Sequence, residues 1–83
     1  MSLERDELID ELKTMYARVL DYPPEVVTDH IDLEAELGVD SLQHQLVLAQ
    51  ARERWRLTLP PESDAPAPLT PASVADYLLR SSS

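Results

Sequence analysis

The residues with the clearest chemical potential lie together at positions 40–44, in the order Asp-Ser-Leu-Gln-His. Ser41 offers a primary hydroxyl, Asp40 a carboxylate beside it, and His44 an imidazole three residues later. A serine hydroxyl can act as a nucleophile when a base lies within hydrogen-bond reach, or it can accept a transferred group. Ser41 is therefore a candidate for either chemistry.

Catalysis by Ser41 requires a base and an oxyanion hole. The chain has two histidines, His30 and His44, and no Gly-x-Ser-x-Gly elbow surrounds the serine. The apolar pattern places His44 on the core side of a helix, and His30 lies in an acidic loop, so we interpret both as structural residues. This pattern favours a serine that accepts a group over one that catalyses a reaction.

The chain contains no cysteine, which excludes disulfide bonds, thiolate zinc sites, iron–sulfur clusters and a cysteine nucleophile. Asp29, Asp32, Glu34 and Glu36 do not form a calcium-binding loop either, because the single glycine, Gly38, does not stand at the position that such a loop requires relative to its ligands. We therefore predict no metal site.

The 83 residues suffice for one small domain, and a hydrophobic content of 43% with 28% charged residues is typical of a folded chain. A net charge of −9 argues against nucleic-acid and membrane-surface binding, and it favours a monomer with basic protein partners. The excess acid lies in residues 1–40, which hold twelve acids and three bases. With an acidic start and no apolar run long enough for a membrane span, we expect a cytoplasmic protein.

Apolar residues at steps of three and four predict an amphipathic helix over residues 3–20. Ser2 is its expected N-cap, and two consecutive prolines end it. Residues 23–40 are predicted to form a long ordered loop attached to the core, since large apolar residues recur along it. Gly38 is expected at a position that needs positive φ. The apolar stripe of the helix comprises Leu8, Ile9, Leu12, Met15, Tyr16, Val19 and Leu20.

A second helix is predicted to begin after Asp40, which forms a capping-box pattern with Gln43, and to end near residue 57. Its apolar residues fall into two groups on opposite sides. The group assigned to the core comprises His44, Val47, Leu48, Ala51 and Trp55. The group expected to stay partly exposed comprises Leu42, Leu46 and Ala49, flanked by Gln45, Gln50 and Glu53. Such a patch is a candidate docking surface, although single exposed leucines are also normal.

A last helix is predicted to begin at Pro71 behind a capping Thr70, with an inward stripe of Val74, Tyr77 and Leu78. The fold class is therefore all-α: a bundle of three main helices with a long loop between the first and second. The proline-rich loop before the last helix leaves room for one short helix. Residues 1–80 would form the domain and residues 81–83 a disordered tail.

The segment LEAELGVDSL, residues 33–42, strongly resembles the attachment-site motif of acyl carrier proteins. That motif is an aspartate-serine-leucine triplet after a leucine-glycine pair. The resemblance extends over nearly the whole chain, including the amphipathic first helix, the acidic loop, the segment 55–60 and the last helix, and it implies an acyl-carrier-like bundle. The residues that match the motif are Leu37, Gly38, Asp40, Ser41 and Leu42.

The resemblance implies that Ser41 accepts 4′-phosphopantetheine from coenzyme A through a phosphopantetheinyl transferase, with Asp40 and Leu42 beside it in the cofactor site. Asp40 would cap the helix or contact the transferase. The chain would not be an enzyme: it would tether acyl intermediates as thioesters and present them to an acyltransferase, a ketosynthase or other biosynthetic enzymes. The docking face would comprise Leu42, Gln45, Leu46 and Ala49.

The second helix departs from the carriers of fatty-acid synthesis, in which this helix is typically acidic. Gln43, Gln45 and Gln50 stand there instead, and Leu46 occupies a position where a recognition glutamate is expected. The segments DYPPEVV and DLEAELGVDS are similar to carriers of bacterial polyketide and related secondary-metabolite synthases. We therefore predict a role in polyketide or antibiotic biosynthesis.

Two alternatives remain open at the level of sequence. A peptidyl or aminoacyl carrier of a nonribosomal-peptide-type pathway would use the same serine. Such carriers more often have a second glycine followed by histidine or aspartate, where this chain has Val39 and Asp40. A helical interaction module that is never modified would not need Ser41 at all.

Overall fold

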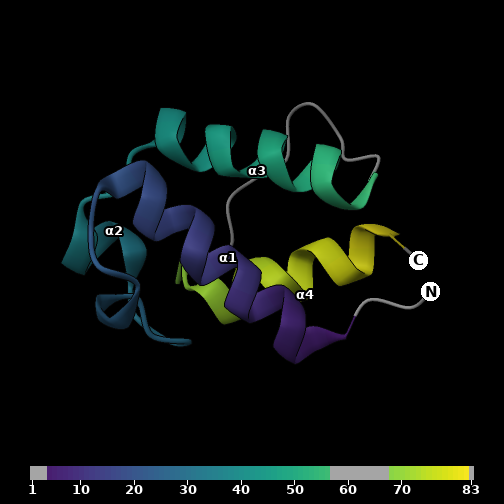
Figure 1. The fold of residues 1–83 in the computed structure, drawn as a ribbon, viewed down its shortest axis with the longest axis horizontal. Helices are drawn as coiled ribbons and strands as arrows, with labels where there is room; N and C mark the ends of the chain where they lie inside the picture. Colours follow the sequence, from purple (N-terminus) through teal and green to yellow (C-terminus); the bar gives the residue numbers. More distant parts are fainter. Residues whose placement is uncertain (1–3, 57–67, 83) are drawn as a thin grey trace.

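The computed structural model describes residues 4–56 and 68–82, and these ranges contain helices and no strand. The predicted all-α fold is confirmed (Figure 1). The elements in chain order are α1 (Arg5–Leu20), the 3₁₀ helix η1 (Pro24–Val26), α2 (Leu33–Leu37), α3 (Ser41–Trp55) and α4 (Pro71–Ser82).

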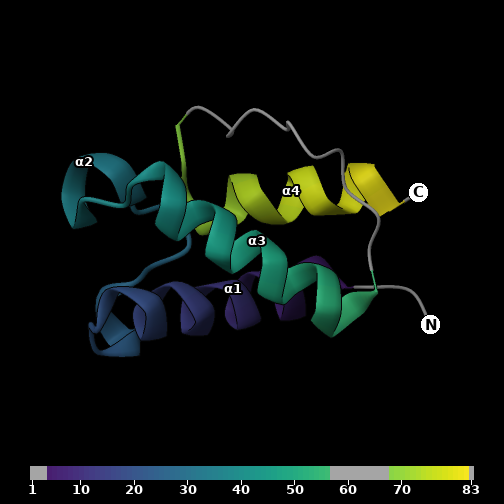
Figure 2. The same cartoon turned by 90° about the horizontal axis from the view of Figure 1, so that it is seen from above.

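The three long helices pack around one apolar core, and α1 lies against both α3 and α4. Short α2 lies at one end of the bundle, next to the start of α3 (Figures 1 and 2). Within the described ranges, no helix combines the length and the apolar character needed to cross a bilayer.

Helix α1 follows the predicted apolar stripe, and its inward residues are buried. It begins at Arg5, two residues later than predicted, with Glu4 as an N-cap that forms no side-chain hydrogen bond. The predicted cap, Ser2, lies outside the described residues. The helix ends where Asp21 takes a left-handed conformation with φ of 61°. The buried residues of α1 are Leu8, Ile9, Leu12, Met15, Tyr16 and Ala17.

The long connection between α1 and α3 is confirmed, but it contains two short helices, η1 and α2, that the periodicity did not predict. The carboxylate of Asp32 caps α2 by accepting a hydrogen bond from the Ala35 N–H at 2.9 Å. Gly38 ends α2 with φ of +71°, as expected for the only glycine. Val27, Leu33 and Val39 attach the connection to the core.

The two predicted sides of α3 are confirmed. His44, Val47, Leu48 and Ala51 are buried, and Trp55 is half-buried. The helix ends at Trp55 because Arg56 takes a left-handed conformation with φ of 54°, two residues before the predicted end.

Helix α4 begins at Pro71, as predicted, and the Thr70 hydroxyl accepts a hydrogen bond from the Ser73 N–H at 3.0 Å. Its backbone stays helical through Ser82, so two residues assigned to the tail belong to the helix. The short helix considered for the proline-rich loop falls in residues 57–67, outside the described ranges. The inward stripe of α4 has Val74 and Leu78 buried and Tyr77 half-buried.

Candidate functional site

Ser41 is the first residue of α3, and its side chain is exposed. The turn that precedes it is held by a complete capping box. The Asp40 carboxylate accepts a hydrogen bond from the Gln43 N–H at 2.8 Å, and the Gln43 side-chain oxygen accepts one from the Asp40 N–H at 3.2 Å. This reciprocal pair fixes the backbone on both sides of the serine while leaving its hydroxyl accessible.

The start of α3 is electrostatically suited to a negative group. The first intrahelical bond runs from the His44 N–H to the Asp40 carbonyl at 3.0 Å, so the amides of Ser41 and Leu42 have no acceptor within the helix. The helix dipole adds partial positive charge at the same end. An anion attached to the Ser41 hydroxyl would therefore lie beside two amide donors.

Ser73 provides a contrast with Ser41. Its hydroxyl accepts a hydrogen bond from the Thr70 N–H at 2.9 Å and donates to the Pro68 carbonyl oxygen at 2.9 Å. The Ser41 hydroxyl forms no hydrogen bond with any described residue. Of these two serines, only Ser41 has a hydroxyl available for modification.

The surface that follows Ser41 on α3 is apolar and open. The exposed fraction is 79% for Leu42 and 50% for Leu46. Gln45 is exposed as well, and Ala49 is half-buried. The structure thus brings the four residues predicted to form a docking face onto one side of α3, in line with Ser41.

His44 points away from this surface and into the core. Its Nδ1 shares a hydrogen bond of 2.8 Å with the Tyr16 hydroxyl, and the two rings are nearly parallel with centroids 6.4 Å apart. Burial lowers the pKa of His44, while the charge of Glu34 acts to raise it. Burial also raises the pKa of Tyr16. The imidazole is therefore neutral near pH 7 and engaged by Tyr16, which excludes it as a base poised against Ser41.

The sequence pattern did not predict the hydrogen bond between Tyr16 and His44. One feature of the sequence could have indicated it: both residues lie on inward stripes, and their polar side-chain ends need a hydrogen-bond partner when buried.

His30, by contrast, is exposed in a turn, so packing gives it no structural role. Among the described residues, no group of three or more histidines, cysteines or acids is arranged to hold a metal ion.

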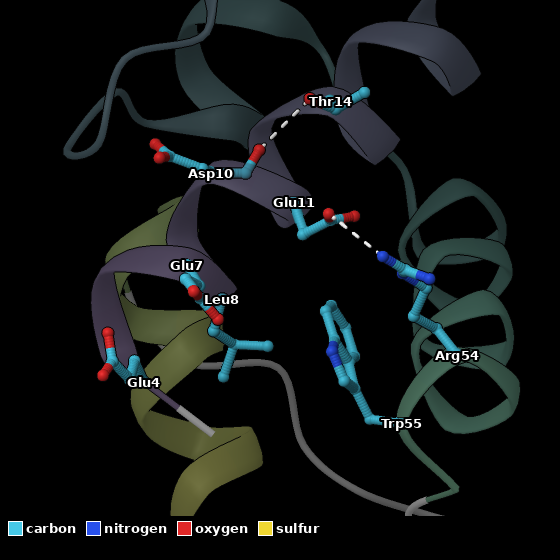
Figure 3. A pocket seen from close by; sticks show the side chains of 8 residues that line it. All are labelled: Glu4, Glu7, Leu8, Asp10, Glu11, Thr14, Arg54 and Trp55. Carbon is cyan, nitrogen blue, oxygen red and sulfur yellow. Dashed lines mark hydrogen bonds and ion pairs between the residues drawn. The ribbon is translucent and has the colours of Figure 1, made fainter. Parts of the chain in front are cut away.

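A concave region lies between α1 and the last turn of α3, away from Ser41 (Figure 3). This groove has a volume of about 430 Å³, and sequence analysis did not predict it. Arg54 donates to a carboxylate oxygen of Glu11 across it at 3.2 Å. Since α3 rises 1.5 Å per residue, the groove is about 20 Å from Ser41 along the helix and is separate from its site. The groove is lined by Glu4, Glu7, Leu8, Asp10, Glu11, Thr14, Arg54 and Trp55.

Comparison with known proteins identifies the group to which this arrangement belongs. A family model described as the phosphopantetheine attachment site matches residues 10–78, from the first half of α1 into α4. No curated protein and no solved structure matches the chain. Domains of the matched family hold 4′-phosphopantetheine covalently, work with phosphopantetheinyl transferases and biosynthetic enzymes, and are in general not catalytic. Because the match covers most of its length, the chain belongs to the phosphopantetheine attachment site family.

Proposed function

We propose that this chain is an acyl carrier protein and that Ser41 carries its 4′-phosphopantetheine. The observation that supports this assignment best is an exposed, unengaged hydroxyl on the first residue of α3, inside the region matched by the family model. Asp40 and Leu42, on either side, complete the attachment site. Asp40 fixes the turn through its capping bond, and Leu42 lies exposed beside the hydroxyl.

The residues around Ser41 fit the group. Its phosphate would lie beside the amides of Ser41 and Leu42 at the positive end of α3. The rest of the group would extend into solvent, since Ser41 and Leu42 are both exposed. When attached, 4′-phosphopantetheine supplies a terminal thiol that carries an acyl group as a thioester. The chain has no cysteine and therefore no thiol of its own for this purpose.

Attachment requires one substitution at phosphorus. The Ser41 oxygen would attack the phosphorus that bears the pantetheine group in coenzyme A, forming an Oγ–P bond. The bond from that phosphorus to the adenosine bisphosphate leaving group would break, and the hydroxyl proton would pass to the transferase. No base of this chain is needed, which agrees with the engagement of His44 by Tyr16.

In this function, the protein positions the acyl group for its partner enzymes and does not itself catalyse a reaction. A tethered acyl group has a high effective concentration at the active site of each partner. The capping box holds the backbone at Ser41 in one conformation, so the point of attachment of 4′-phosphopantetheine is fixed. The partner enzymes would bind next to this point on the docking face, which comprises Leu42, Gln45, Leu46 and Ala49.

Intact-mass analysis tests this proposal. The wild-type chain is incubated with coenzyme A, magnesium and a broad-specificity phosphopantetheinyl transferase, beside Ser41→Ala and Ser73→Ala. We expect a gain of one phosphopantetheine in wild type and Ser73→Ala, with the modified peptide containing Ser41, and no gain in Ser41→Ala. Absence of any gain in the folded wild-type chain with several transferases would refute the assignment.

For the pathway, we propose bacterial polyketide or related secondary-metabolite biosynthesis. The support is the uncharged start of α3 together with the resemblance of residues 21–27 and 32–41 to polyketide carriers. The phosphopantetheinylated chain is offered malonyl-coenzyme A with a polyketide acyltransferase, or amino acids with adenylating enzymes. Loading of malonyl alone supports the proposal, and loading of an amino acid alone would assign the chain to the peptidyl carriers.

A further inference from the structure

The groove between α1 and the last turn of α3 has an acidic wall (Figure 3). Glu4, Glu7 and Glu11 stand at steps of three and four residues, so they form one row along α1. Asp10 lies on the same wall, and Lys13 pairs with it at 3.3 Å. The volume of the groove, about 430 Å³, is in the range of sites that bind ligands. The groove therefore presents a row of carboxylates to any molecule that enters it.

Most of this negative charge is not neutralised by the residues that the structure describes. Arg54 is the one cationic residue among those that line the groove, and it pairs with Glu11 at 3.2 Å. Glu4 and Glu7 are exposed and form no ion pair with another described residue. Glu4 also makes no capping hydrogen bond with its side chain. The wall thus retains negative charge that a cationic partner can neutralise.

Trp55 adds an aromatic surface to the groove. Its indole ring points into the groove from the last turn of α3, beside Leu8, and the residue is half-buried (Figure 3). The face of an indole attracts cations, and a guanidinium stacks on it better than an ammonium because the guanidinium is planar. A guanidinium can also donate two parallel hydrogen bonds to one carboxylate. An indole ring beside a row of carboxylates is therefore suited to arginine side chains.

Other charged ligands fit the groove less well. Among the described residues, no three acids are arranged to hold a metal ion. A nucleic acid or an anionic lipid surface would be repelled by the carboxylates and by the net charge of −9. A protein segment with arginines at successive turns of a helix would match the row, because neighbouring carboxylates of the row are also about one turn apart.

From these observations we propose that the groove docks an arginine-bearing segment of a partner protein, with an arginine side chain between the Trp55 indole and the carboxylates of α1. The groove is about 20 Å from Ser41 along α3, so a segment bound there leaves the serine uncovered. One protein can then hold the chain at this end while an enzyme acts at Ser41. The inference does not depend on the proposed function, because docking in the groove requires no group on Ser41.

Binding can be followed by the fluorescence of Trp55, which is the only tryptophan in the chain. The probe is a capped alanine-based peptide with arginine at every fourth position, titrated into the full chain. We expect a saturable change in fluorescence that weakens at high salt, and binding of the lysine counterpart should be about threefold weaker. No saturable change, or equal affinity for the arginine peptide and for its lysine counterpart or spermine, would overturn the proposal.

Two double variants with the same change in net charge test whether the peptide binds in the groove. Glu4→Gln with Glu7→Gln removes two carboxylates from the groove and should weaken peptide binding about tenfold. Glu34→Gln with Glu36→Gln removes two exposed carboxylates from α2 and should weaken it about twofold or less. Equal weakening in both would mean that the peptide responds only to net charge, which would contradict the proposal. Circular dichroism checks that both variants are folded.

Arg54→Gln tests the same groove with an effect of the opposite sign. The substitution removes the guanidinium that competes with the peptide for Glu11, so the peptide should bind about threefold more tightly. The control is Arg18→Gln, which removes the same charge from an exposed residue of α1 that does not line this groove. Unchanged or weaker binding to Arg54→Gln, or an equal gain in Arg18→Gln, would show that the peptide does not bind beside Glu11.

Discussion

The two ends of α3 lie in different surroundings. At the first end, Ser41 and Leu42 are exposed, and no charged side chain follows until Arg52. At the last end, Trp55 is half-buried beside α1, and Arg54 pairs with Glu11 in a groove bordered by further acids (Figure 3). The difference shows that one helix can place its ionic contact at the last end, where Arg54 reaches Glu11 of α1, and leave the turns that follow Ser41 without a charged side chain.

The largest expected effect is on the free energy of unfolding, and it concerns two leucines on opposite sides of α3. Leu48→Ala removes a buried side chain and should lower the free energy of unfolding by about 2–5 kcal/mol. Leu46→Ala truncates a half-exposed side chain and should change it by about 0.5 kcal/mol or less. Urea denaturation measures both values. Similar losses in the two variants would contradict the division of α3 into a core side and an exposed side.

Tyr16→Phe tests how His44 is held in the core. The substitution removes the hydroxyl that shares a 2.8 Å hydrogen bond with the imidazole and leaves a buried polar nitrogen without its partner. We expect the free energy of unfolding to fall by about 1–3 kcal/mol. The control is Tyr22→Phe, which alters an exposed tyrosine and should have little effect. An equal loss in both variants would mean that the buried pair contributes nothing specific.

The same pair predicts a pH dependence of stability. Burial lowers the pKa of His44 below that of the unfolded chain, so between these two values the unfolded state binds more protons. Stability should therefore decrease as pH falls below about 6.5, with a slope of at most about 1.4 kcal/mol per pH unit. Thermal unfolding of wild type and His44→Gln from pH 7.5 to 5 measures this slope. A slope as steep in His44→Gln would assign the effect to other groups.

At the serine end, Asp40→Ala removes the carboxylate that caps α3. Loss of its hydrogen bond to the Gln43 N–H should lower the free energy of unfolding by about 1 kcal/mol. Asp40→Asn is the matched control, because an asparagine side chain also accepts this hydrogen bond and should retain most of the stability. Equal destabilisation in both variants would show that the charge of Asp40, and not its capping bond, stabilises the start of the helix.

Much of this arrangement could be predicted from the sequence because it depends on local patterns. The spacing of Leu42 and Leu46 against Val47 and Leu48 separates the two sides of α3 without knowledge of other helices. The capping box likewise needs only residues three positions apart. Helix α2 was not predicted because five residues do not complete two turns and give no measurable period.

Features that depend on how helices are rotated against each other could not be predicted. The hydrogen bond between Tyr16 and His44 joins residues 28 positions apart, and its geometry is set by the packing of α1 against α3. The groove at the far end of α3 arises in the same way, since Glu11 and Arg54 belong to different helices. Periodicity shows which side of a helix faces the core, but not which residue of the neighbouring helix it meets.

The smallest expected effect concerns the ion pair at the far end of α3. Arg54 and Glu11 have side chains that are 57% and 42% exposed, so water screens their attraction. Arg54→Gln should therefore lower the free energy of unfolding by about 0.5 kcal/mol or less, and the difference should shrink at high salt. Because the pair is about 20 Å from Ser41, the rate of phosphopantetheine transfer should stay at the wild-type value. A fall in that rate would mean that the transferase also contacts this end of α3, and that the two ends are not separate in function.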